Sequence, residues 1–325
     1  MLHIEFTPED VGRVRLAARP DPLWETVFSL YRLRWGGPPL IFGRWRQLAV
    51  RASRRPDLEQ LMPLVPGGFF PDFLTPSEGT SGLAAGLDAL LRTPRCRLRR
   101  DVELLAMQGS PLPAWTADLA DGDAETLQRL AAAIHSHHEA VVAPVWPEAR
   151  AHVEADRARR ARALLDGGSE GLLRSYLPMM RWNPPVLEVP DFAADRTLRL
   201  DGRGLLLLPA FLSWGTTDAL HDPELPPVLV YPVEHSLTVS AGQDNTSVAA
   251  LIGMTRTAVL ESVGDGRTTS ELARRVGVSA ASISQHTAVL REAGLVHTSR
   301  IGKAVLHSVT PLGAALLEPR ATTDS

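Results

Sequence analysis

The histidines near residue 137 come closest in this chain to the residue types and spacing of a metal site. His135 and His138 are three positions apart, which places them on one face of a helix, and Glu139 follows directly. Imidazole and carboxylate groups suit zinc or nickel. The sequence has no HExxH spacing, however, and two prolines interrupt the segment before His152. The pattern is more typical of a solvated polar helix face, so we expect no metal site and no other cofactor.

Catalytic motifs of the common enzyme classes are missing from the sequence. It contains no GxSxG nucleophile motif, no P-loop and no GxGxxG dinucleotide-binding motif. Its single cysteine, Cys96, excludes an internal disulfide and a metal site built from several cysteines. We therefore predict no catalytic residues and no enzymatic activity.

Arginine and tryptophan side chains are the remaining candidates for ligand binding in the first two-thirds of the chain. The segment VEADRARRARAL is rich in arginine, which usually indicates the solvated face of a helix. An anionic ligand or a supporting contact to DNA is the alternative for these residues: Arg157, Arg159, Arg160 and Arg162. Most tryptophans are expected to pack in the core, and some to line a ligand cavity whose position the sequence does not give.

Length and composition predict a two-domain globular protein. The chain has 325 residues, of which 44% are hydrophobic and 22% charged, and its net charge is -3. This charge argues against binding of nucleic acid over the whole surface, but it permits a local basic face. No apolar run reaches the roughly 20 residues of a membrane span, and the first residues lack the pattern of a signal peptide. A cytoplasmic protein without membrane contact is expected.

Helical periodicity dominates the first half of the chain. Thr7 is predicted to cap an early helix, and a nearly continuous helical stretch is expected from Ala124 to Leu165, ended by Gly167 and Gly168. Other helices are separated by Pro and Gly breaks and are predicted at residues 21–35, 39–52, 56–65, 82–92 and 97–107.

From Arg181 the periodicity changes to short apolar runs bounded by Pro, Asp and Gly. The predicted strands of a small antiparallel sheet are residues 186–189, 197–200, 205–208 and 226–233. Asp201 and Gly202 have the composition of a hairpin turn between two of them.

The last quarter of the chain begins with two predicted helices. The first covers Leu251 to Val263. Thr268 then lies three residues before Glu271, which is the spacing of a capping box at the start of a second helix. Gly277 supplies a tight turn after this helix.

A third, longer helix follows the turn. Ser279 is predicted to cap it, and it runs to about Ala293, with Ile283, Val289 and Leu290 on its buried side. Two alternating strands with the sequences LVHTSR and AVLHSV form a hairpin, and a last short helix follows Pro311. A helix-turn-helix followed by a two-stranded wing is the plan of a winged helix.

In a winged helix, small polar side chains of the longer helix enter the major groove, while basic groups on the wing neutralise phosphates. The residues predicted to contact DNA are Thr269, Ser279, Ala281, Ser282, Ser284, Gln285, His286, Arg291, Arg300 and Lys303. The last two are placed at the tip of the wing.

The fold class is therefore expected to be mainly α with small antiparallel β elements. We predict an α-rich N-terminal domain with a small β-sheet over residues 1–240 and a polar linker over residues 241–247. A winged helix-turn-helix domain then covers residues 248–318, and residues 319–325 form a disordered tail.

The sequence also resembles a known family. The stretches TTSELARRVGVSAASISQHTAVLREAGLV and SRIGKAVLHSVTPLG are similar to ArsR-type winged-helix repressors. The stretches VAPVWPEARAHVEADRARRARALLDGG and RWNPPVLEVP resemble actinobacterial ArsR-like regulators with a long N-terminal domain of unassigned function. The resemblance implies transcriptional regulation, usually by a dimer. Metal-sensing members carry paired cysteines where this chain has SELARRV, so that thiolate site cannot exist here.

We therefore predict a DNA-binding transcriptional regulator, with a repressor as the favoured form, whose N-terminal domain senses a small molecule. In the alternative, this domain only mediates dimerisation or binds a protein partner. An enzyme fused to a DNA-binding domain is less favoured. Neither the identity of an effector nor the operator sequence follows from the residues.

A homodimer is expected because the charges of the C-terminal module nearly balance, which gives a single copy only a weak attraction to DNA. A two-fold dimer doubles the contacts and reads half-sites about 34 Å apart. The apolar residues assigned to the dimer interface lie on the first and last helices of the module: Leu251, Ile252, Met254, Val259, Leu312, Ala315, Leu316 and Leu317.

Overall fold

The computed structural model describes residues 1–109, 111–190, 192, 195–235, 246–264, 266–301 and 304–317. The chain divides into two compact units. The first consists of Met1–Leu33 and Leu48–Glu234, and the second of Arg34–Gln47 and His235–Ser325. Most of the predicted linker and the whole predicted tail lie outside the described residues, so the domain boundaries stay a prediction. Among the described residues, no helix has the length and apolar character needed to cross a membrane.

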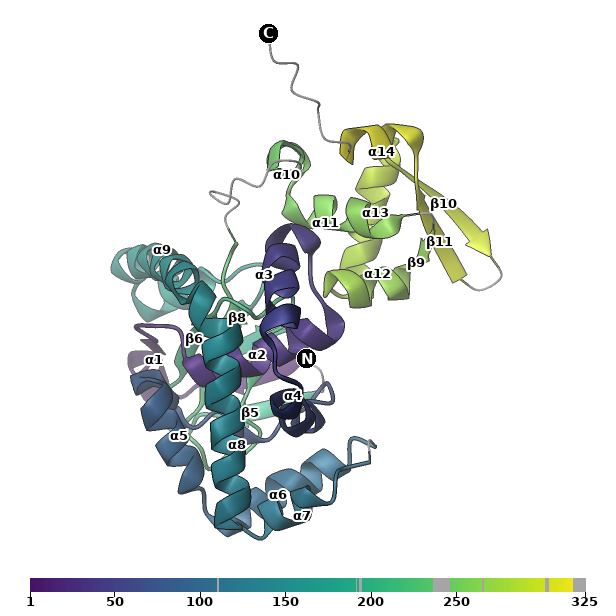
Figure 1. Cartoon of the computed structure of the whole chain (residues 1–325). Coiled ribbons are helices and arrows are strands. Elements are labelled where there is room, and N and C mark those ends of the chain that lie inside the picture. Colours follow the sequence, from purple (N-terminus) through teal and green to yellow (C-terminus); the bar gives the residue numbers. More distant parts are fainter. Residues whose placement is uncertain are drawn as a thin grey trace. The chain divides into compact units, whose positions relative to one another are not determined.

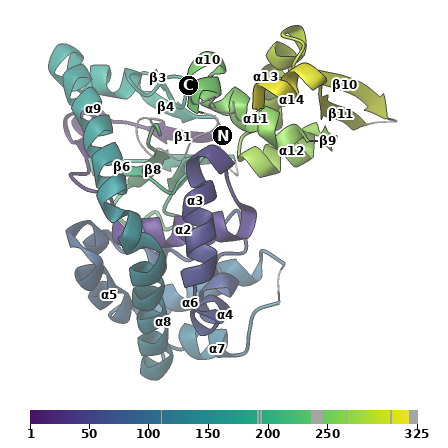
Figure 2. The same cartoon turned by 45° about the horizontal axis from the view of Figure 1, so that its top comes forward.

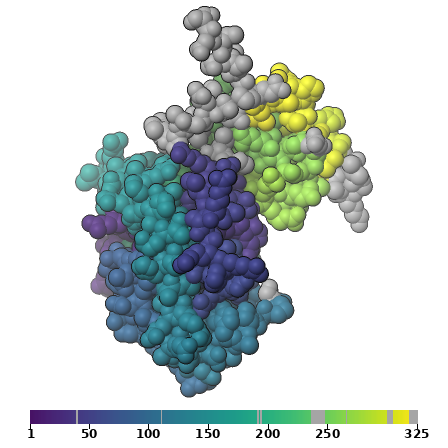
Figure 3. Space-filling model, viewed as in Figure 1, coloured from purple at the N-terminus to yellow at the C-terminus, as the bar shows by residue number. Residues whose placement is uncertain are grey.

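The first unit is rich in helices, as predicted (Figure 1). Its helices are α1 (Pro8–Gly12), α2 (Pro22–Trp35), α4 (Arg55–Leu61), η1 (Met62–Leu64), η2 (Asp72–Leu74), η3 (Ser77–Ser81), α5 (Leu83–Leu91), α6 (Arg95–Ala106), α7 (Trp115–Ala120), α8 (Ala124–His137), η4 (His138–Val142), η5 (Ala143–Val145) and α9 (Trp146–Arg174). Helix α3 (Pro39–Ala52) is divided between the two units, and the end of α2 also belongs to the second. Helix α8 packs against α4, α5 and α7. The teal surface in Figure 3 belongs to α8 and α9.

The long helical stretch ends at the predicted glycines, and a second helix follows it. The two prolines of this segment change the type of helix without ending it: η4 is a π-helix, η5 is a 3-10 helix, and Pro147 lies in the first turn of α9. Gly168 leaves the helical conformation, with φ 61° and ψ -160°, so α9 consists of two helices that meet at this kink, and the second ends at Arg174. The expectation that Gly167 and Gly168 end the long helix is therefore confirmed, since glycine readily adopts a positive φ, but the second helix was not predicted.

Two four-stranded sheets lie in the first unit, and both are mixed, whereas the sequence predicted one antiparallel sheet. The first has the order β3 (Arg181–Asn183), β4 (Val186–Val189), β1 (Leu2–Glu5) and β5 (Arg196–Arg199). The second has the order β2 (Arg15–Leu16), β6 (Leu206–Ala210), β8 (Val228–Pro232) and β7 (Asp218–Ala219). The β1–β5, β2–β6 and β6–β8 pairs are parallel.

The predicted strands exist, but the predicted hairpin between two of them does not. Asp201 and Gly202 do form a turn with positive φ values. The strands on either side of it, β5 and β6, belong to different sheets. Short-range patterns find a turn, but they do not show which strands pair across it, because parallel partners lie far apart in the sequence.

One apolar core joins the two sheets to the end of α9. It contains β1 residues, such as Leu2 and Ile4, together with Leu207 of β6, Leu229 of β8 and Leu173 of α9. All five are almost fully buried. The strands β6 and β8 are buried along nearly their whole length, which is typical of strands in parallel sheets.

A buried ionic cluster supports this core beside α9. Asp156 accepts hydrogen bonds from Tyr231 Oη at 2.6 Å and from Arg159 at 2.6 Å. The Arg160 guanidinium lies 3.4 Å from the same carboxylate and 4.1 Å from the centre of the Tyr176 ring. The prediction of a solvated arginine face was therefore wrong for Arg160, whose side chain is 5% exposed.

The second unit contains the C-terminal module. Its elements there are α10 (Thr246–Ile252), α11 (Met254–Val263), β9 (Arg267–Thr268), α12 (Thr269–Val276), α13 (Ala280–Glu292), β10 (Val296–Ile301), β11 (Ala304–Val309) and α14 (Pro311–Leu317). The strands form an antiparallel sheet in the order β10, β11, β9, and the β10–β11 hairpin extends beyond the helices of this unit (Figure 2). The predicted fold class is thus confirmed: mainly α with small β elements and a C-terminal winged helix.

Candidate DNA-binding interface

The entry to helix α12 has the predicted capping box. Thr268 Oγ1 accepts a hydrogen bond from the backbone N–H of Glu271, and the Glu271 carboxylate accepts one from the backbone N–H of Thr268 at 2.8 Å. Gly277 ends the helix in the left-handed conformation, with φ 75° and ψ 35°. Both ends of α12 are therefore fixed by local interactions that the sequence predicts.

Helix α13 starts at Ser279, whose hydroxyl accepts a hydrogen bond from the backbone N–H of Ser282 at 3.1 Å. Its buried side consists of Ile283, Thr287 and Leu290, which lie four and three positions apart and therefore on one face. The assignment of Val289 to this side was wrong, since Val289 is 41% exposed.

The predicted first helix is in fact two helices. Gly253 separates α10 from α11 with a φ of 86°, which favours glycine. Val259 of α11 is fully buried in the core of the module, together with Leu260, Leu272 and Ile283. It cannot contribute to the predicted dimer interface. Leu251 and Leu312, by contrast, are 75% and 60% exposed.

The outer face of α13 carries the residues predicted to read bases. Ala281, Ser284 and Gln285 are exposed, and Ser282 is half-buried. The Ser284 hydroxyl donates a hydrogen bond to the backbone carbonyl of Ala280 at 2.9 Å, so it is already engaged within the helix. Gln285 presents a side-chain amide that combines donor and acceptor, which suits a bidentate contact to adenine.

Basic groups lie along α13 and its neighbour α11. Arg291 is exposed in the last turn of α13. His286 is half-buried, and burial together with the positive charge of Arg256 lowers its pKa. A neutral imidazole at neutral pH follows, so His286 would act as a hydrogen-bonding group and not as a cation toward DNA.

His307 connects the wing to the helix-turn-helix. Its Nε2 lies 3.0 Å from Thr269 Oγ1 at the start of α12, and its Nδ1 lies 3.0 Å from Thr298 Oγ1 in β10. His307 is 3% exposed, and burial followed by the charge of Arg291 lowers its pKa. The hydroxyl of Thr269, predicted to contact DNA, is thus part of an internal link.

The two predicted wing-tip residues are described only in part. Arg300 lies in β10, where it is paired with Val305 of β11. Lys303 lies outside the described residues, so its contact with DNA stays a prediction. Two exposed cations in the last turn of α12, Arg274 and Arg275, were not among the predicted contacts, although the dipeptide RR in SELARRV marked them.

The histidines near residue 137 do not form a solvated face. His135 is exposed, but His137 and His138 are buried. His137 Nε2 lies 2.9 Å from Ser29 Oγ, and His138 Nδ1 lies 3.2 Å from a carboxylate oxygen of Glu139. Within the described part of the chain, no three His, Cys, Asp or Glu side chains are arranged to hold a metal ion.

Comparison with known protein families gives two matches. A model described as a helix-turn-helix domain matches residues 252–299. A model of a family of unknown function (DUF5937) matches residues 13–236, which is more than half of the chain. No curated protein and no solved structure matches the chain. The two matches confirm the resemblance to ArsR-like regulators that carry a long N-terminal domain.

Proposed function

Because the chain belongs to the family of unknown function DUF5937 and ends in the helix-turn-helix domain of a DNA-binding regulator, we propose that it is a transcriptional repressor controlled by a small molecule. The winged helix reads the operator, and the N-terminal region holds the effector. As a regulator of transcription it would act in the cytoplasm, where bacterial DNA lies.

The observation that carries the proposal is the outer face of α13. Small or polar side chains, Ala281, Ser284 and Gln285, are exposed on it, while Ile283 and Leu290 anchor the opposite side in an apolar core. A helix of this kind can enter a major groove without steric obstruction and present hydrogen-bonding groups to base edges. Exposed Arg274, Arg275 and Arg291 supply charges for phosphates.

The test is selection of a binding sequence from random duplex DNA with the full chain, followed by titration with the selected and a scrambled duplex. We expect Gln285→Ala to cost about 1–3 kcal/mol on the selected sequence and little on the scrambled one. Glu59→Gln, at an exposed position of α4 in the other unit, is the matched control. Equal losses on both duplexes would contradict base reading by Gln285, and no enrichment of any sequence would contradict the function.

Dimerisation is part of the proposal. Exposed Leu251 of α10 and Leu312 of α14 offer apolar surface, and a two-fold dimer would double a weak electrostatic attraction. Light scattering at micromolar concentration tests the dimer. A monomer that binds a single half-site as tightly as a palindrome would contradict it. In that case the alternative remains that the N-terminal region binds a protein partner.

A further inference from the structure

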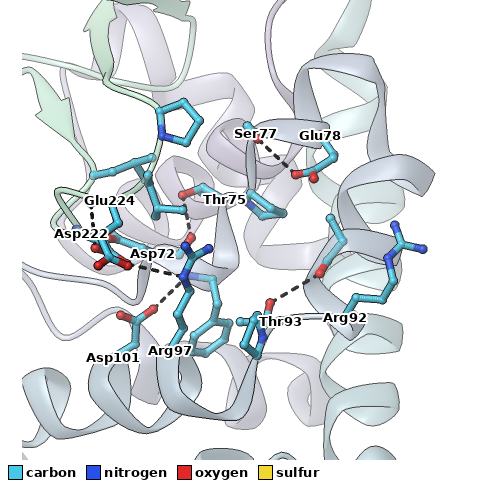
Figure 4. Close-up of a pocket in the computed structure, with 17 residues that line it drawn as sticks. Asp72, Thr75, Ser77, Glu78, Arg92, Thr93, Arg97, Asp101, Asp222 and Glu224 are labelled. Atoms are coloured by element: carbon cyan, nitrogen blue, oxygen red, sulfur yellow. Dashed lines mark hydrogen bonds and ion pairs between the residues drawn. The ribbon is translucent and has the colours of Figure 1, made fainter. Parts of the chain in front are cut away.

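A cavity of about 300 Å³ opens within the first unit, at the meeting point of four segments (Figure 4). Its wall includes η2, η3, the end of α5 with the start of α6, and the loop at residues 220–226 that follows β7. The volume lies at the lower limit of pockets that bind small molecules. The cavity is therefore large enough for a small metabolite.

Carboxylates outnumber cations in this wall. Five carboxylate side chains line it, including Asp72, Asp101 and Asp222, against two guanidinium groups, those of Arg92 and Arg97. Figure 4 shows Asp101, Asp222 and Arg97 close together on one side of the cavity. A wall with this charge favours a ligand that brings positive charge.

The fold fixes the carboxylates before any ligand arrives. Asp72 accepts hydrogen bonds from the backbone N–H groups of His221 at 2.9 Å and Asp222 at 2.6 Å. Asp101 accepts one from the backbone N–H of Phe73 at 3.0 Å. Asp72 and Asp101 are each 4% exposed. Groups held in this way lose little conformational entropy when a ligand binds.

Two arginines near the cavity lie beside Asp222, and the charge of a third, Arg196, acts on Asp72. Arg100 lies 2.9 Å from the Asp222 carboxylate, and Arg97 lies 3.6 Å from it. The Arg97 side chain is 39% exposed and at the longer distance, so it is held less tightly. Burial, with the charges of Asp72 and Asp222, raises the pKa of Asp101 to about 7, against the attraction of Arg100. The cavity therefore has an excess of acid groups over cations.

We propose that this cavity binds a small organic cation, an amine or a guanidine, with its charged group against Asp101 and Asp72. The role of this cavity as the effector site of a regulator rests on the proposed function. Binding of a cation in the cavity does not depend on that function. Arg97, whose guanidinium also lines the cavity, would repel the bound cation.

Binding of a cation would also release a proton. The charged groups around Asp101 are Arg97 and Arg100 of its own helix, Asp72 of η2 and Asp222 of the loop. A cation at Asp101 favours the ionised carboxylate, so its pKa falls on binding. Affinity should consequently rise as the pH increases through about 7, and it should level off above that.

The experiment compares three probes of equal chain length with the full protein: pentane-1,5-diamine, pentane-1,5-diol and glutarate. Thermal shift and calorimetry measure their binding. We expect the diamine to stabilise the protein, with affinity that rises from about pH 6 to about pH 8, and the diol and glutarate to have no effect. Binding of glutarate, or binding of none of the probes, would overturn the proposal.

Two variants with opposite expected effects locate the site. Asp101→Asn keeps an acceptor for the Phe73 N–H but removes the charge, and it should weaken the diamine by about tenfold or more. Arg97→Gln removes a competing cation and should tighten the diamine. Exposed Asp118→Asn on α7 is the matched control and should leave affinity unchanged. Weaker diamine binding by Arg97→Gln, or equal losses in Asp101→Asn and the control, would overturn the assignment.

The proposed function and the cation site have separate tests, so that one can fail without the other. DNA binding is measured without any probe, and its absence would remove the regulator while leaving a cation site. Diamine binding that does not change the affinity for the selected duplex would leave the site in place but overturn its role as the effector site.

Discussion

Two helices, one in each unit, begin with the same kind of capping box, but the two boxes have different surroundings. A Thr and an acidic residue three positions later form a capping box at α1, with Thr7 and Asp10, and at α12, with Thr268 and Glu271. At α12 the acidic residue is exposed, and the hydrogen bonds of the box stay within the first turn. At α1 the acidic residue is fully buried.

Asp10 does more than cap a helix. Its carboxylate also accepts hydrogen bonds from the backbone N–H groups of Gly202 at 3.1 Å and Gly204 at 2.7 Å, 192 and 194 residues away. Gly204 has a φ of 72°, and a Cβ there would lie 2.5 Å from the carbonyl oxygen of Arg13. In the first unit the buried carboxylate of the box thus joins segments almost 200 residues apart, whereas the box of the second unit makes only local bonds.

Among the tests of this difference, removal of the Asp156 carboxylate should cause the largest loss of stability. Asp156→Ala would leave the buried Arg160 guanidinium without its carboxylate partner and only with hydrogen bonds to Ser175. We therefore expect a loss of about 3–5 kcal/mol in the unfolding free energy of the first unit. Peptide-resolved hydrogen exchange on the full chain measures it, with α13 peptides as internal reference. Glu170→Ala, which breaks the exposed Arg174–Glu170 pair, should cost about 1 kcal/mol or less. Similar losses in both variants would contradict the role of the buried cluster.

Asp10→Ala should have the next largest effect. It leaves the N–H groups of Gly202 and Gly204 without an acceptor, and a buried unsatisfied donor costs about 1–3 kcal/mol. We expect a loss of about 2–4 kcal/mol in total for the first unit, measured by denaturant unfolding. A loss no larger than that of an ordinary cap would show that the long-range bonds contribute nothing.

Thr268→Ala tests the exposed box of the second unit. We expect a loss of about 1 kcal/mol, since only the cap of α12 is affected. Faster hydrogen exchange should be confined to the α12 and β9 peptides, while Thr268→Ser keeps the hydroxyl and serves as the control. Exchange that also increases throughout the first unit would contradict the separation of the two units.

The smallest expected effect is the dependence of stability on pH, which should have opposite signs in the two units. Burial raises the pKa values of Asp21 and Glu25 to about 7, so their folded forms bind protons more tightly than the unfolded chain does. These two carboxyl groups, together with Asp101 and Asp218, should therefore add stability to the first unit as the pH falls from about 8 to about 5. His137 and His221, whose pKa values burial lowers to about 4, oppose this gain. In the second unit, burial lowers the pKa values of His286 and His307 below their ordinary 6.5, and hydrogen bonds from Thr268 lower the pKa of Glu271 below its ordinary 4.5. The second unit should therefore lose stability as the pH falls below about 6.5. Hydrogen exchange corrected for intrinsic rates checks both slopes, and parallel slopes would refute the difference.

The same contrast explains how much the sequence reveals. Thr268, Glu271 and Gly277 act within one turn of their neighbours, so their spacing alone predicts α12 and the turn after it. The partners of Asp10 are far away in the chain, and nothing near Asp10 marks Gly204 as one of them. Pairing in the two mixed sheets was missed for this reason, and so was the cavity, whose wall comes from four separate segments.

At the candidate DNA-binding interface, the sequence predicts which side chains are exposed better than it predicts which of them already form hydrogen bonds within the protein. It placed Gln285 on the exposed side of α13 correctly. It did not show that the hydroxyls of Ser284 and Thr269 are already bonded, because those partners depend on rotamers and on the fold of the wing. His307 was overlooked, although an inward-facing histidine in an alternating strand was a signal for it.

The link through His307 fixes the spacing between the helix-turn-helix and the wing. Thr298 of β10 holds the buried His307 ring of β11 on one side, and Thr269 at the start of α12 contacts it on the other. The helix-turn-helix and the wing therefore cannot slide past each other without breaking the His307–Thr269 bond. On the proposed mode of binding, the distance along the duplex between the major-groove contact and the wing contact is then built into the protein. An operator with one base pair inserted between these contacts would have to unwind and shorten to match it, at a cost in deformation free energy.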